Sequence, residues 1–79
     1  MLYAAQIRAA RVLLGWRQQD LAKAAKIGLA TLARIEQGQG IAQAHVATIV
    51  RIQAALERKG LRFINKADEI GVALQTKQL

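Results

Sequence analysis

The fold is decided by residues 14–38, which read LGWRQQDLAKAAKIGLATLARIEQG. Apolar residues recur at helical spacing over residues 18–25 and again over residues 29–37, which predicts two short helices. The three residues between them, Lys26-Ile27-Gly28, are typical of a tight turn, and Gly38 closes the second helix. Two short helices joined by a three-residue turn have the geometry of a helix-turn-helix, which we place at residues 17–38.

The sequence on either side predicts two longer helices. One runs from Tyr3 to Leu14 and ends at Gly15. The other runs from about Ala44 to Lys59 and is stopped by Gly60. The clearest loop of the chain, Gln37-Gly38-Gln39-Gly40, precedes this last helix. The inward-facing residues of the two helices are expected to be Ile7, Ala10, Leu14, Val46, Ile49, Ile52 and Leu56.

The C-terminal part of the chain changes its period. Apolar residues alternate in Leu61–Ile64 and in Gly71–Leu74, which predicts two short strands joined by a polar turn from Asn65 to Ile70. A two-stranded hairpin is only marginally stable alone in water. Its apolar face is therefore expected to pack on the helices, on a second subunit, or on both.

Length and composition predict one small, mainly α domain. The chain has 79 residues, is rich in alanine and contains no proline, which favours helix. We expect a compact domain of four to five helices with a short C-terminal two-stranded β-hairpin. Residues 1–60 would form the helix-turn-helix domain. Residues 61–79 would form a hairpin extension and tail that belongs to the same domain or to a dimer interface.

Charge points to a polyanionic partner, and the residue types argue against catalysis. Twelve Lys and Arg against five Asp and Glu give a net charge of +7, which suits nucleic acid or an acidic protein. The chain has no cysteine and one histidine, His45, so we expect no metal site, no cofactor and no enzymatic activity. No uncharged apolar run reaches the ~18 residues of a membrane span, so no membrane role is expected.

The run over residues 14–38 resembles the Cro/phage-repressor-like (Xre) helix-turn-helix proteins, and the match covers most of residues 4–60. The ending GLRFI…GVALQ is similar to a C-terminal hairpin of one branch of small bacterial Xre regulators. The resemblance implies a sequence-specific transcriptional regulator of double-stranded DNA, of bacterial, phage or mobile-element type. The residues that match the family pattern are Gln18, Leu21, Ala22, Ile27, Leu32, Ile35, Glu36 and Gly38.

The resemblance implies an ion pair between Arg11 and Glu36 that ties the first helix to the end of the third. The alternative is that Arg11 is a solvated charge on an exposed face. Trp16 is expected to fill the junction between the first two helices.

The resemblance also implies contacts with DNA phosphates. In the family a glutamine at the place of Gln18 grips a phosphate together with backbone N–H groups at a helix N-terminus. Arg17 stands where a Ser or Thr cap is usual, and a nearby phosphate would offset the lost cap; the alternative is an arginine lying on solvent. Lys26 replaces a turn glycine, at a cost of roughly 1–2 kcal/mol if φ is positive, and its charge would reach a phosphate. In the loop that follows the motif, Gln39 is the candidate for a phosphate contact.

Base reading is expected from the second helix of the motif. Arg34 would bond bidentately to guanine, assisted by Thr31, while Leu29 and Ala30 would contact thymine methyl groups beside Gly28. Alternatively, Leu29 belongs to a protein-binding surface and Ala30 is a simple helix former.

We therefore expect a homodimer on a near-palindromic operator, because one recognition helix reads too few base pairs. The candidates for the dimer surface are the hairpin and the exposed apolar groups of the helix predicted from about Ala44 to Lys59. Autoregulation and a cytoplasmic, nucleoid-associated location follow from the resemblance, with RNA polymerase or another regulator as a further candidate partner. The alternative function is a protein-interaction module, of anti-activator or antitoxin-like type, on a helix-turn-helix that has lost base readout. The apolar Gly28-Leu29-Ala30 stretch motivates that alternative.

Overall fold

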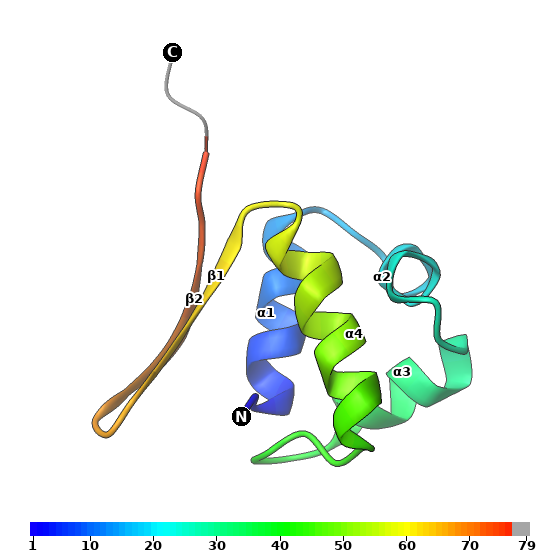
Figure 1. Ribbon diagram of the computed structural model, residues 1–79, viewed down its shortest axis with the longest axis horizontal. Coiled ribbons are helices and arrows are strands. Elements are labelled where there is room, and N and C mark those ends of the chain that lie inside the picture. Colours follow the sequence, from blue (N-terminus) through cyan, green and yellow to red (C-terminus); the bar gives the residue numbers. More distant parts are fainter. Residues whose placement is uncertain (77–79) are drawn as a thin grey trace.

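The computed structural model describes residues 1–76 and arranges them as four helices followed by a hairpin (Figure 1). The predicted mainly α fold is confirmed. The predicted C-terminal tail extends to residue 79, and residues 77–79 lie outside the described residues. The elements are α1 (Ala4–Leu13), α2 (Gln18–Ala25), α3 (Leu29–Gln37), α4 (Val46–Glu57), β1 (Leu61–Lys66) and β2 (Glu69–Leu74).

The two helices of the motif, α2 and α3, begin and end at the predicted residues, whereas α4 is shorter than predicted at both ends. The loop before α4 is held against the N-terminal segment, since Tyr3 and Ile41 form a β-bridge and Ala42 N–H donates to the Leu2 carbonyl at 2.8 Å. This extended pairing delays the helix to Val46. At the other end, Gly60 N–H donates to the Glu57 carbonyl three residues back, which tightens the last turn.

The core lies where the four helices meet. Its largest fully buried apolar side chains come from every helix: Ile7, Leu21, Leu32, Ile35, Ile52 and Leu56. The prediction for Val46 is wrong, because 78% of this residue is exposed. Val46 and Val50 are one helical turn apart on one face of α4, while Ile52 and Leu56 occupy the face turned to the core.

The hairpin is longer than predicted and has a shorter turn. Its register pairs Asn65 with Ile70 and Lys66 with Glu69, so only residues 67–68 turn. The reason is a tertiary contact that the strand pattern does not contain. The buried Gln6 of α1 donates from Nε2 to the carbonyls of Ile64 (3.1 Å) and Gly71 (2.9 Å), and it exchanges side-chain hydrogen bonds with Asn65, the first residue beyond the predicted strand.

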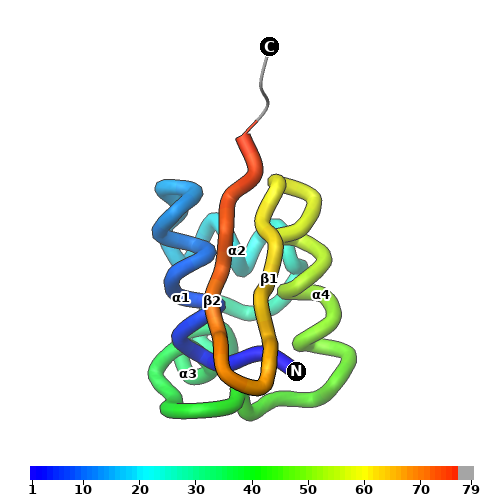
Figure 2. Tube along the Cα trace, turned by 90° about the vertical axis from the view of Figure 1, so that its left-hand side faces the viewer, coloured from blue at the N-terminus to red at the C-terminus, as the bar shows by residue number. Residues whose placement is uncertain are grey.

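The hairpin packs on the helices with its apolar face. Strand β2 lies beside α1 and strand β1 beside α4 (Figure 2). Gly60 makes the close turn into β1 with φ of +98°, and a Cβ there would stand 2.9 Å from the carbonyl oxygen of Gln75. The apolar side chains that face the core are Leu61, Phe63, Val72 and Leu74.

Candidate nucleic-acid interface

Helix α3 is buried on one side and exposed on the other. Leu32, Ile35 and Glu36 are each at most 2% exposed, so they face the core. The other side presents the residues predicted to read bases. Gly28, Leu29, Ala30 and Arg34 are exposed, and Thr31 is half-buried.

Gly28 is the residue before α3, with φ of −69°. A Cβ at this position would meet only Thr31 Oγ1, at an ordinary 3.7 Å. The backbone therefore does not require glycine here. What the missing side chain provides is access to the start of α3, where a ligand can approach the backbone closely.

The structure brings Arg11 and Glu36 together. Arg11 Nε lies 2.9 Å from Glu36 Oε2, and Arg11 Nη2 donates to Glu36 Oε1 at 3.0 Å. Arg11 Nη1 also donates to the carbonyl of Trp16 at 2.9 Å, and Trp16 is half-buried between α1 and α2. Because Glu36 is 2% exposed, its charge is compensated almost wholly by these protein groups.

Gln18 joins the same network, which the sequence did not indicate. Its Nε2 donates to Glu36 Oε1 at 3.1 Å, so the first residue of α2 is held by the end of α3. One carboxylate thereby fixes α1, α2 and α3 relative to one another. The amide of Gln18 is half-buried and oriented before any ligand arrives.

A notch of about 410 Å³ opens beside this network. Gln18 and the predicted Gln39 line it, together with Arg8, which was not among the predicted site residues. Arg8 donates to the carbonyl of Glu36 and remains exposed. The sequence could have indicated this position, because Arg8 precedes Arg11 by three residues and residues i and i+3 of a helix share a face.

Arg17 is exposed at the N-cap of α2, and, as expected, its side chain makes no capping hydrogen bond. The carboxylate of Asp20 accepts the Arg17 backbone N–H at 2.8 Å, and this acidic group also lies in the positively polarised first turn. The Arg17 guanidinium lies 3.7 Å from the same carboxylate, with 75% of its side chain exposed. Asp20 thus offsets part of the penalties that we had assigned to a phosphate, while the side-chain cap itself is absent.

Lys26 adopts the left-handed conformation, with φ of 58° and ψ of 49°, at the C-terminal end of α2. That conformation costs roughly 1–2 kcal/mol for a residue with a side chain. Lys26 does not join Gln18: the two stand at opposite ends of α2, about 12 Å apart along its axis. It lies instead with Arg51 and Arg58 around a hollow of about 510 Å³ between α2 and α4.

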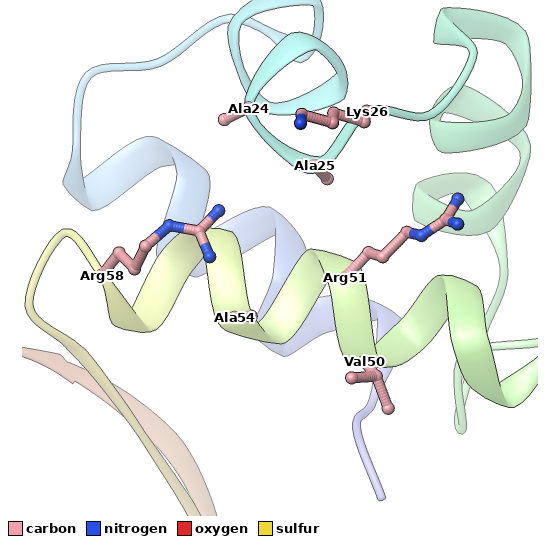
Figure 3. A pocket seen from close by; sticks show the side chains of 7 residues that line it. All are labelled: Ala24, Ala25, Lys26, Val50, Arg51, Ala54 and Arg58. Atoms are coloured by element: carbon pink, nitrogen blue, oxygen red, sulfur yellow. The ribbon is translucent and has the colours of Figure 1, made fainter.

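Figure 3 shows how this basic hollow is built. Arg51 and Arg58 extend from α4 toward α2, where Lys26 lies, and alanines line the space between. Val50 extends from α4 in the other direction. Residue spacing does not predict this grouping, because the three cations come from two elements.

A third hollow, of about 580 Å³, borders the exposed side of α3. Thr31 and Arg34 line it with Gln43, His45 and Thr48 from the loop and the start of α4. His45 is exposed at the N-cap of α4 and makes no capping hydrogen bond through its side chain. The lining is polar and contains no acidic side chain, so this hollow suits an anion or a hydrogen-bonding edge.

Two further observations concern residues 1–76. These residues contain no group of three His, Cys, Asp or Glu side chains placed to hold a metal ion. None of the helices in this part of the chain has both the length and the apolar character needed to cross a bilayer.

The chain matches a known family model over most of its length. A family model described as helix-turn-helix matches residues 7–63, from within α1 to within β1, and so includes all of α2, α3 and α4. No curated protein matches the sequence.

Proposed function

The chain belongs to the Cro/C1-type, Xre-like helix-turn-helix family of DNA-binding regulators, which is not an enzyme family, and from this premise we propose its specific activity. It is a transcriptional regulator that binds a near-palindromic operator in double-stranded DNA as a homodimer. One observation carries the proposal: a buried network holds the end of α3 against the N-terminus of α2, while Arg34 of the same helix stays exposed.

Phosphate contacts are assigned to the first turn of α2 and its surroundings. The free backbone N–H groups at the start of a helix and its dipole attract an anion. Gln18 stands at that start, and Arg8 and Gln39 line the same notch. Arg17 and Lys26 are exposed cations at the two ends of α2 and add sequence-independent attraction.

Base contacts are assigned to α3. Arg34 is the exposed residue of α3 with a donor fork that matches guanine O6 and N7. Thr31 lies beside it in the same hollow. Leu29 and Ala30 offer methyl groups to thymine, and Gly28 lets the helix start approach the DNA closely.

Residues 1–60 are proposed as the DNA-binding domain, with the hairpin packed on it as part of the same unit. The regulator would act on its own promoter, in the cytoplasm and on the nucleoid. RNA polymerase or another regulator is proposed as a further protein partner. These assignments rest on family likeness. Regulation of its own promoter is tested by measuring transcription from that promoter with and without the protein.

One observation favours a second function, that of a protein-interaction module. Leu29 is 49% exposed at the start of α3, between Gly28 and Ala30. A polypeptide partner would bury these three residues without any need for base-reading groups. That module would bind DNA weakly or not at all.

The dependence of DNA binding on salt separates the two functions. A dimer that contacts 6–10 phosphates is expected to lose about 10³–10⁵-fold in affinity between about 50 and 200 mM salt. Fluorescence anisotropy with a labelled duplex measures this slope. Gln18→Ala should weaken binding to all duplexes alike, whereas Gln75→Ala, a change at an exposed glutamine after β2, should leave it unchanged. A shallow slope, or no binding by a folded protein, would favour the interaction module.

A further inference from the structure

A cluster of apolar side chains is exposed on the side of α4 that does not face the core. Met1, Ile41, Val46 and Val50 are 79%, 40%, 78% and 58% exposed, and we call these four residues the apolar patch. They line a shallow hollow of about 310 Å³ between the N-terminus, the loop before α4 and α4 itself. Exposed apolar side chains that gather in one place mark an interaction surface.

We propose that a second copy of this chain docks on the apolar patch, with α4 of one copy against α4 of the other. The proposal rests on the proposed function, because a regulator of a two-fold symmetric operator needs a two-fold symmetric protein.

Charge favours a second copy at this place over the rest of the surface. The chain carries a net charge of +7, so two copies repel each other when their basic surfaces approach. Every side chain that lines the hollow beneath the patch is uncharged. Val50 stands at the boundary, because it also lines the basic hollow, into which Arg51 and Arg58 extend from α4 toward α2 (Figure 3). The apolar patch is therefore a face on which two copies approach with little repulsion.

The position of the apolar patch also favours a second copy as its occupant. Ala44 lines both the hollow beneath the patch and the hollow that contains Thr31 and Arg34. A copy seated on the patch thus lies next to the base-reading side of α3. By two-fold symmetry, the α3 of the second copy also lies next to the patch. Both recognition helices then flank the two-fold axis, as reading two half-sites requires.

The geometry of α4 suits a self-complementary contact. Val46 and Val50 are one turn apart, so they form a short ridge along the helix. In a two-fold interface the same ridge meets its own copy, and a ridge of two β-branched side chains packs against an identical one. The hairpin offers less, because Leu61, Phe63, Val72 and Leu74 already pack on the core and Ile70 is its one large apolar side chain among the exposed ones in residues 1–76.

The test compares two substitutions of an exposed valine by lysine. Val50→Lys puts a cation in the patch, and Val12→Lys makes the same change at a 65% exposed valine of α1 outside it. Lysine forms helix at least as well as valine, so both variants should fold, and circular dichroism checks this. Sedimentation equilibrium is expected to show a dimer for the wild type and for Val12→Lys. For Val50→Lys the dimer dissociation constant should rise about tenfold or more.

Ile41→Ser provides a second variant in the loop, where helix formation is not involved, and it should weaken the dimer in the same direction. A dimer unchanged by both Val50→Lys and Ile41→Ser would overturn the proposal. So would a wild-type chain that stays monomeric both free and bound to a duplex.

The DNA-binding function is measured separately on the same proteins. If the patch variants become monomeric but no protein binds any duplex, the interface stands and the proposed function fails. If all bind DNA and the dimer is unaffected, the interface is wrong and the function stands.

Discussion

The two sides of α3 are built on different principles. On the buried side, Ile35 and Leu32 fill the core, and Glu36 accepts hydrogen bonds from α1 and α2. On the exposed side, Gly28, Leu29 and Ala30 present few polar groups, and Arg34 is the charged residue there. The buried side determines where the helix lies, and the exposed side determines what it can read. The two properties should therefore respond to substitution independently.

The largest effect is expected on the buried side. Glu36→Ala would leave the Arg11 guanidinium without its carboxylate, and breaking a buried pair in this way costs on the order of 3–5 kcal/mol. Because a small domain has a total stability of only about 5–15 kcal/mol, much of the protein should unfold early in a urea titration followed by circular dichroism.

The double variant Arg11→Met, Glu36→Met is the control for this prediction. It removes both charges and fills their space with flexible apolar side chains, so a large part of the lost stability should return. If Glu36→Ala unfolds at the same urea concentration as the wild type, the network does not hold α3 in place, and the distinction between its two sides fails.

A smaller effect, on binding alone, is expected on the exposed side. Arg34→Ala should lose about 1–3 kcal/mol at the base that it reads, while the free energy of unfolding changes by less than about 0.5 kcal/mol. Titration of duplexes that differ at single positions measures the first quantity, and urea unfolding measures the second. Arg62→Ala removes an exposed arginine from β1 and should leave the base preference intact. A destabilised Arg34→Ala protein would mean that the exposed side also supports the fold.

The smallest effect concerns the turn that joins the two helices. Lys26→Gly relieves the left-handed strain at φ of 58°, and the gain is expected to be at most about 1 kcal/mol, because glycine also raises the entropy of the unfolded chain. Thermal unfolding should therefore move to a slightly higher temperature.

Lys26→Gly should also change the salt dependence of DNA binding. Removing one cation that approaches a phosphate should reduce the slope of log affinity against log salt by at most about 1, with no change in base preference. An unchanged slope would remove Lys26 from the phosphate contacts.

The sequence predicted the central part of this fold well, and for a local reason. Helices α2 and α3 begin and end where the apolar spacing and the turn at residues 26–28 placed them. The left-handed Lys26 was anticipated because the family has glycine at that turn. These features depend on residues close together in the chain, so periodicity and turn chemistry contain them.

The features that were predicted wrongly or not at all share a different cause, which is contact between segments that are distant in the sequence. Val46 follows a loop pinned to the N-terminus, and the strand lengths depend on Gln6, which lies about sixty residues before β2. The place of Arg8 in the notch and the grouping of Lys26 with two arginines of α4 likewise need the assembled helices. Which residues touch DNA stays a prediction, because base contacts depend on the partner as well as on the protein.

The most direct test of the central claim is selection of duplexes from a random pool at physiological ionic strength, with the wild type and Arg34→Ala in parallel. We expect a two-fold symmetric consensus for the wild type, with a guanine in each half-site whose preference disappears in Arg34→Ala. Recovery of no consensus by a folded wild type would contradict this expectation, and so would an identical consensus from both proteins.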